Sequence, residues 1–111
     1  MATAQLGSLE LTVLLTVARL GEEAYGLGIR RDVSARLDRD YSVGAVYTTL
    51  ERLEEKGLVS SYKTEPLPTR GGRSRRQFKV TASGQRALRQ AERVAKQMWA
   101  GLGNTLNPER A

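Results

Sequence analysis

The sequence predicts a mostly α-helical fold with one small β-hairpin, arranged as a winged helix-turn-helix with one further helix behind it. Two observations predict this fold. Apolar residues recur at helical spacing in three successive segments before residue 57, and again after residue 81. Between these segments the period changes to two, as in strands. We expect a winged-helix domain over residues 1–81, a helix over 82–102 and a tail over 103–111.

The first helix is expected over residues 6–20 and is apolar on nearly every face. One stripe consists of Leu6, Leu9, Val13, Val17 and Leu20. The other faces carry Leu11, Leu14, Leu15 and Ala18. A small domain rarely buries a helix on all sides, so this pattern indicates a second subunit.

The next two helices are expected over residues 25–37 and 42–56. The second helix repeats apolar residues every four positions: Tyr25, Ile29, Val33 and Leu37. Ser42 is a favoured N-cap residue for the third helix, and Gly57 is favoured just past its end. The apolar stripe of the third helix is Val46, Leu50 and Leu53, and its opposite face is expected to hold Ala45, Thr48, Thr49 and Arg52.

A hairpin follows, with strands expected at 58–65 and 75–80 and a tip at 66–74 that contains two prolines and two glycines. Thr81 can cap the last helix. That helix, expected over 82–102, carries an apolar stripe at the spacing of a helix-packing surface: Leu88, Ala91, Ala95, Met98 and Leu102.

Basic residues are concentrated around the hairpin. The chain has 18 Lys and Arg against 12 Asp and Glu, a net charge of +6, and residues 61–80 alone hold six basic groups and one acidic group. Arg70, Arg73, Arg75 and Arg76 lie within seven residues, and no acidic residue occurs between Glu65 and Glu92. Arginine suits bidentate phosphate contact, so the hairpin predicts binding of a polyanion.

The third helix complements the hairpin, because short side chains at its start allow close approach to the major groove of duplex DNA. Tyr47 can reach a phosphate or a base, and Arg52 follows one turn later. Three alternatives stay open. In the first, the exposed face of the third helix is merely solvated. In the second, the fold is a protein-interaction or RNA-binding module. In the third, Asp38 and Asp40 form a catalytic pair, although no partner base is visible.

Cysteine and histidine are both missing from the sequence, which excludes thiol and imidazole metal ligands and the common nucleophilic triads. We therefore expect no enzyme activity, no metal and no cofactor. The longest apolar run is too short to span a bilayer, and no secretory signal is apparent. The expected location is cytoplasmic, with no membrane partner.

Several stretches resemble the PadR family of bacterial transcription regulators. They are LGSLELTVLL from Leu6, YGLGIRR from Tyr25, SVGAVYTTLERLEEKGLV from Ser42, GGRSRRQFKV from Gly71 and TASG from Thr81. The resemblance extends from about residue 6 to residue 100. The block from Ser42 is its most specific part, and a single helix after the hairpin indicates the shorter subfamily.

The resemblance implies a homodimeric repressor of transcription, released from DNA by a small aromatic or hydrophobic compound. It implies DNA contacts by Ser42, Tyr47, Thr48, Thr49, Arg73 and Arg75. It also implies that the last helix serves dimerisation. A two-fold dimer would place two third helices one DNA turn apart, so the binding site is expected to be palindromic.

The residues themselves also suggest a dimer interface and an effector site. The apolar stripe of the last helix would pack on the first helix of a partner, through Leu6, Leu9, Val13, Leu88, Ala91, Ala95, Met98 and Leu102. Trp99 is the only tryptophan, next to Met98 and one turn from Ala95. It is either a packing residue or an aromatic platform for a flat ligand.

Overall fold

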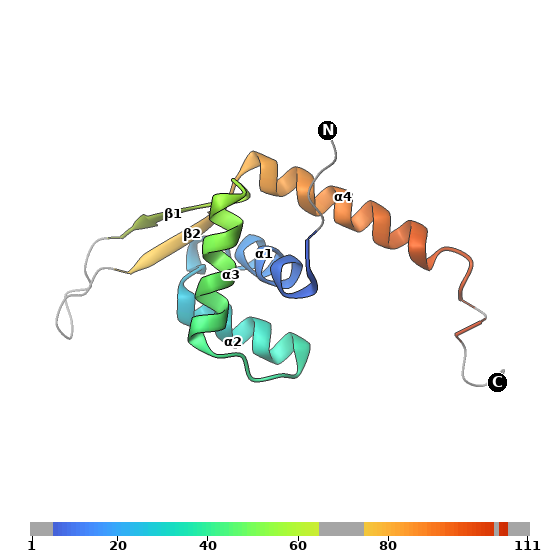
Figure 1. Cartoon of the computed structure of the whole chain (residues 1–111), viewed down its shortest axis with the longest axis horizontal. Helices are drawn as coiled ribbons and strands as arrows, with labels where there is room; N and C mark the ends of the chain where they lie inside the picture. The colour runs from blue at the N-terminus through green and yellow to red at the C-terminus, as the bar shows by residue number, and fades with distance from the viewer. Residues whose placement is uncertain (1–5, 65–74, 104, 107–111) are drawn as a thin grey trace.

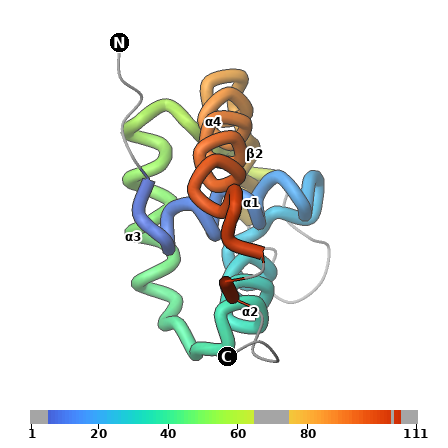
Figure 2. The backbone as a smooth tube through the Cα atoms, turned by 90° about the vertical axis from the view of Figure 1, so that its right-hand side faces the viewer, coloured from blue at the N-terminus to red at the C-terminus, as the bar shows by residue number. Residues whose placement is uncertain are grey.

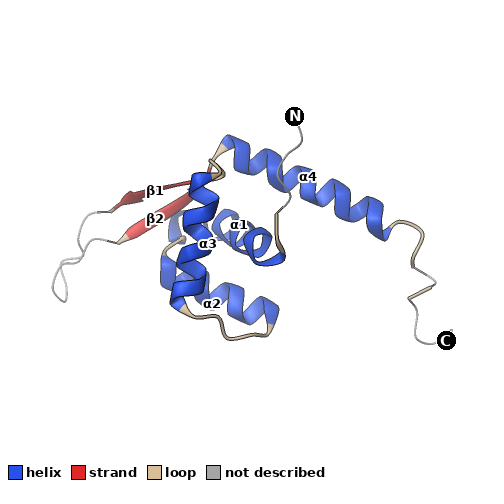
Figure 3. Ribbon diagram, viewed as in Figure 1, coloured by secondary structure: helices blue, strands red, loops and turns tan. Residues whose placement is uncertain are grey.

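The computed structural model describes residues 6–64, 75–103 and 105–106. Its elements follow the predicted order (Figure 3). They are α1 (Ser8–Leu20), the short 3-10 helix η1 (Gly21–Glu23), α2 (Gly26–Leu37), α3 (Val43–Glu55), β1 (Val59–Lys63), β2 (Arg76–Val80) and α4 (Ala82–Trp99). The predicted fold class, mostly helical with a small hairpin and a C-terminal helix, is confirmed.

The three helices α1, α2 and α3 enclose the core, with the hairpin and α4 extending from it in opposite directions (Figure 1). Figure 2 shows from the side that α4 lies next to α1. The largest fully buried apolar side chains come from all three helices and from both strands: Leu14, Ile29, Leu50, Leu53, Val59 and Phe78. Burial of these side chains is the main source of stability.

Helix α1 is buried on one side and not all round. Val13 is fully buried in the core of its own chain, so the structure corrects its predicted place in a subunit interface. Leu15, on another face, is 41% exposed. The end of α1 at Gly21 is as predicted, since that glycine has a φ of 56°. One chain therefore does not bury α1 on all sides, in keeping with the expectation that a small domain could not.

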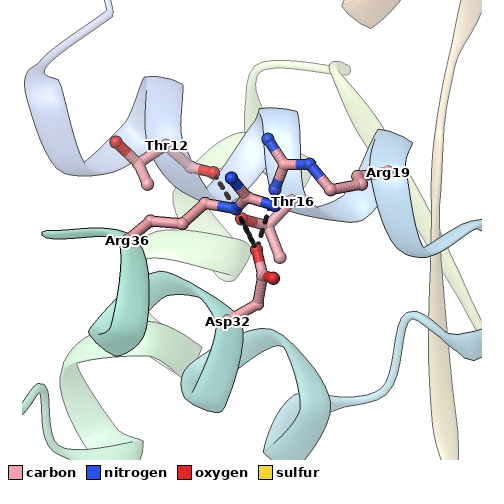
Figure 4. A network of polar contacts seen from close by, with 5 residues as sticks. All are labelled: Thr12, Thr16, Arg19, Asp32 and Arg36. Atoms are coloured by element: carbon pink, nitrogen blue, oxygen red, sulfur yellow. Dashed lines mark hydrogen bonds and ion pairs between the residues drawn. The ribbon is translucent and has the colours of Figure 1, made fainter.

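A polar network joins α1 to α2 around Asp32 (Figure 4). The buried Thr16 hydroxyl donates to Asp32 Oδ2 at 3.1 Å, and Arg19 and Arg36 donate to the same oxygen at 2.8 and 2.9 Å. Burial raises the pKa of Asp32. The hydrogen bonds from Arg36 and Thr16, together with the positive charges of Arg36 and Arg19, outweigh burial, so the pKa lies below its usual 3.8. The network fixes the packing of the two helices that support α3.

The hairpin is antiparallel, with Val59 opposite Val80 and Lys63 opposite Arg76. A third short segment joins it, because Tyr25 bridges to Gln77 and the Phe78 N–H donates to Ala24 O at 2.9 Å. This pairing explains why Gln77 is only 7% exposed, although simple strand alternation would place it with the exposed Lys79.

Helix α4 begins as predicted, with the Thr81 side chain accepting from Gly84 N at 3.0 Å. It ends at Trp99, three residues before the predicted Leu102. Ala100 is extended and Gly101 has a φ of 80°, and neither conformation continues a helix. Among the described residues no helix is long and apolar enough to cross a membrane.

Candidate nucleic-acid interface

Helix α3 presents a mixed exposed face. The start of this face is uncharged, with Gly44 and Thr48, and its end carries the charged residues Glu51, Arg52 and Glu55. A side chain added at Gly44 would meet nothing within 4 Å, so packing inside the chain does not require glycine there. Glycine in a helix costs about 1 kcal/mol relative to alanine. The open space at Gly44 leaves the first turn accessible to a large partner.

The turn before α3 is held by polar contacts from both sides. The Ser42 side chain accepts from Ala45 N at 3.1 Å, as predicted for an N-cap, and Ser42 is exposed. Arg30 Nε donates to Tyr41 O at 2.8 Å, and its Nη2 lies 3.2 Å from Asp40 Oδ1. Asp40 thus has a structural ion-pair partner. These contacts give the first turn of α3 a defined direction.

Thr49 was predicted on the exposed face of α3, and that prediction is wrong. Its side chain is 5% exposed, and its hydroxyl donates to Ala45 O at 2.8 Å. Thr48, one residue earlier, is exposed. Successive helical residues differ by about 100°, so Thr49 falls in the buried stripe with Val46 and Leu53. Thr48 is therefore the threonine that can contact a partner.

Tyr47 lies at the edge between the core and the surface. Its ring packs edge-on against Phe78, with centroids 6.4 Å apart. A Cβ on Gly26 would overlap the Tyr47 hydroxyl and ring, so only glycine allows this ring to pack against the start of α2. Tyr47 is half-buried. It links α3 to both α2 and β2.

The C-terminal end of α3 is connected to the rest of the domain by two ion pairs. Lys56 Nζ lies 2.8 Å from Glu10 Oε2 on α1, and Arg76 Nη2 lies 2.7 Å from Glu54 Oε1. Hydrogen bonds from Lys56 and the Gly7 N–H lower the pKa of Glu10 below its usual 4.5 despite partial burial. Gly57 ends the helix with a φ of 76°, as predicted for this position.

Adjacent arginines at the base of the hairpin are held differently. Arg76 is paired with Glu54 and also donates to Ser61 Oγ at 2.9 Å. The guanidinium of Arg75 lies over the Tyr25 ring, 4.0 Å from its centroid, and the residue is exposed. Arg70 and Arg73 fall outside the described residues. The sequence pattern suggested no acidic partner near this cluster, but Glu54 provides one for Arg76.

The predicted effector residues all lie on the surface of α4. Met98 and Trp99 are 71% and 65% exposed, and Ala95 is also exposed. A cavity of about 800 Å³ beside α4 is lined mainly by polar and basic side chains, including Arg86 and Arg93, and by none of these three residues. Within one chain they do not enclose a ligand.

The remaining residues of the predicted dimer interface fall into two groups. Leu6, Leu9 and Leu88 are partly buried against the core of their own chain. Ala91 is half-buried and Leu102, beyond the end of α4, is 37% exposed. The apolar surface that one chain leaves uncovered is therefore concentrated on the second half of α4, where Val94 is also 42% exposed.

Sequence reasoning missed two residues of this surface, Tyr25 and Glu54. Tyr25 was assigned to the apolar stripe of α2, yet its ring supports Arg75 from the hairpin. Glu54 was given no role, yet it pairs with Arg76 of the hairpin. No local pattern could have revealed these pairings, because each partner lies far along the chain.

Acidic side chains are the candidates for catalysis or metal binding, because the sequence has neither histidine nor cysteine. Within the described part of the chain, no cluster of three or more acidic, histidine or cysteine side chains could hold a metal ion. The acidic residues Asp32, Asp40, Glu10 and Glu54 are all engaged with basic partners. The surface formed by α3 and the hairpin base is suited to binding.

Solved structures share this fold. A PadR family transcriptional regulator from Eggerthella lenta is 28% identical, with a TM-score of 0.63 over 90% of this chain and 88% of that one. RosR from H. salinarum is 25% identical, with a TM-score of 0.67 over 90% and 83%. A PadR-like transcriptional regulator from Bacillus cereus, 20% identical, has a TM-score of 0.71 over 89% and 91% and shows the fold alone.

The amino-acid sequence matches a model of a protein family. Residues 13–90 match the model described as the transcriptional regulator PadR-like family, a span that includes α2, α3, the hairpin and half of α4. No curated protein sequence matches the chain. The chain belongs to the transcriptional regulator PadR-like family, whose members are DNA-binding regulators and not enzymes.

Proposed function

We propose that this protein is a sequence-specific repressor that binds a palindromic site in duplex DNA as a homodimer. The observation that carries the proposal is the exposed, uncharged start of α3, with Gly44 open and Thr48 exposed. Short side chains at the start of a recognition helix permit contact with base edges in the major groove. Arg75, and by sequence Arg70 and Arg73, would supply the phosphate contacts.

The dimer is supported by α4. Its 18 residues extend about 27 Å, and its second half leaves Val94, Met98 and Trp99 exposed. Exposed apolar surface of this kind marks an interaction site. Packing on a second copy would cover it and would give the two-fold symmetry that a palindromic site requires.

DNA fragments of the source genome that the purified protein retains can be sequenced to identify a preferred site. Affinity for that site and for a scrambled duplex is then measured as the salt concentration rises. We expect the selected site to bind at least about a thousandfold more tightly, with both affinities falling steeply with salt. Equal affinity for both duplexes would contradict sequence-specific binding and favour a module that does not read duplex sequence.

The dimer can be tested by light scattering on two matched variants of α4. Met98→Asp places a charge on the apolar face, whereas Gln97→Asp places it on the polar face beside it. We expect twice the monomer mass for the wild type and for Gln97→Asp, and the monomer mass for Met98→Asp at low concentration. If Met98→Asp stays as dimeric as its control, the interface lies elsewhere.

An effector would act at the same face. We propose that a flat aromatic compound stacks on Trp99 between two subunits, near Ala95 and Met98. Because Trp99 is the only tryptophan, its fluorescence reports the site without a label. Titration with phenolic acids and planar drugs is expected to quench it and to release the selected DNA. No quenching by any of them would leave Trp99 as a packing residue.

A further inference from the structure

Two adjacent arginines at the base of the hairpin differ in what remains available to a partner. The guanidinium of Arg76 donates hydrogen bonds to Glu54 and Ser61, with donor–acceptor distances of 2.7 and 2.9 Å. Arg75 stacks its guanidinium carbon 4.0 Å from the centre of the Tyr25 ring. No acidic group within the described residues is paired with Arg75. Among the contacts between described residues, only the flat side of its guanidinium has a partner.

Tyr25 is itself fixed in place from several directions. Its backbone bridges to Gln77 of β2, and its hydroxyl donates to Gln77 Oε1 at 3.4 Å. The residue before it accepts from the Phe78 N–H at 2.9 Å. The carbonyl of Arg75 accepts from the Thr64 N–H at 2.7 Å, which closes the described part of the hairpin. The ring of Tyr25 and the backbone of Arg75 are therefore both held in place relative to β2.

Stacking restrains an arginine without using its hydrogen-bond donors. The five N–H groups of a guanidinium point outward in its plane, whereas an aromatic ring contacts its flat side. A free arginine side chain loses considerable rotamer freedom when it binds a phosphate. An arginine that already rests on a ring loses less, and binding is stronger by that difference.

We propose that Tyr25 is a positioning residue that holds Arg75 ready for a DNA phosphate. The inference rests on the proposed DNA binding and adds a residue from the start of α2 to the hairpin surface. Arg75 thereby makes the contact, and Tyr25 acts only through Arg75. The same contact could have the opposite effect and keep Arg75 away from DNA. Loss of the Tyr25 ring would weaken DNA binding in the first case and strengthen it in the second.

A double-mutant cycle separates these effects. The variants are Tyr25→Leu, Arg75→Ala and the double substitution, with Tyr25→Phe as the conservative control that keeps the ring and removes the hydroxyl. Affinity for a dye-labelled duplex of arbitrary sequence is measured by fluorescence anisotropy, because phosphate contacts do not depend on sequence. Thermal melting of each variant confirms that it is folded at the temperature of the titration.

We expect Tyr25→Leu to weaken binding by about two- to fivefold, the range of an exposed cation–π contact, and Tyr25→Phe to bind like the wild type. In the Arg75→Ala background, Tyr25→Leu should have no further effect. Equal losses in both backgrounds would show that Tyr25 acts through the fold and not through Arg75. Unchanged or tighter binding by Tyr25→Leu would also overturn the proposal. If the wild type binds no duplex at all, the proposed function fails first.

Discussion

The first two turns of α3 and its last two turns differ in what their residues contact. The first turns carry Gly44 and Thr48, which face open space and solvent. The last turns carry Glu54 and are followed by Lys56, both paired with other elements. The same helix thus combines an end that is free for a partner with an end that is fixed to the fold. Substitutions at the two ends should therefore separate DNA binding from stability.

The largest expected effect is a loss of stability on substitution in the last turns of α3, the end that is fixed to the fold. Leu53 is fully buried, so Leu53→Ala removes apolar contacts and leaves a cavity. We expect the free energy of unfolding to fall by about 2 to 5 kcal/mol, measured by urea denaturation. Arg52→Ala, at the neighbouring exposed position, is the control and should change it little. A loss below about 1 kcal/mol for Leu53→Ala would contradict the described core.

The two adjacent threonines of α3 provide a sharper contrast. Thr49→Ala removes a buried methyl group and the hydrogen bond to Ala45 O, so we expect a loss of about 1 to 2 kcal/mol in unfolding free energy. Thr48→Ala should stay within about 0.5 kcal/mol of the wild type. Thermal melting of both variants checks this order. A larger loss for Thr48→Ala than for Thr49→Ala would contradict the burial of Thr49 described above.

Acid should weaken the fixed end through Glu10. Its pKa is lower in the folded chain than the usual 4.5 of an unfolded chain, so its ionised form adds stability above pH 4.5. That stability is lost as the pH falls below 4.5 through the folded pKa. Glu10→Gln should therefore flatten the decline in unfolding free energy as the pH falls below 4.5. An unchanged slope would mean that Glu10 contributes none of the acid sensitivity.

The smallest expected effect concerns the acidic part of the exposed face. Glu51 is exposed on the same face as Thr48, and its negative charge opposes approach of a phosphate backbone to this part of α3. We expect Glu51→Gln to raise affinity for a duplex of arbitrary sequence by no more than about fivefold. Glu22→Gln, with the same change of charge on η1, is the control. Weaker binding of the selected site alone would instead indicate that Glu51 accepts from a base.

Local signals in the sequence were sufficient for the fold but not for the surface. The ends of α3 followed from Ser42 and Gly57, because capping depends on neighbouring residues. Thr49 was misplaced because it lies at the boundary of the buried stripe, and tertiary packing decides on which side it falls. Tyr25 and Arg75 are 50 positions apart, so no periodic pattern connects them.

The apolar stripe of α4 illustrates another limit. The sequence predicted it as a packing surface for a partner subunit, and that stays a prediction, since one chain leaves its second half exposed. What covers that surface is not encoded in the periodicity of the helix. Val13 shows the converse, since its apolar pattern suggested a partner subunit and its own chain buries it completely.

We propose above all that the free end of α3 reads the sequence of duplex DNA. The most direct test measures the affinities of the wild type and of Thr48→Ala for the selected site and for a scrambled duplex at one salt concentration. We expect Thr48→Ala to weaken binding to the selected site and to leave binding to the scrambled duplex unchanged, so that the ratio of the two affinities falls. An unchanged ratio would contradict base contact by this helix face.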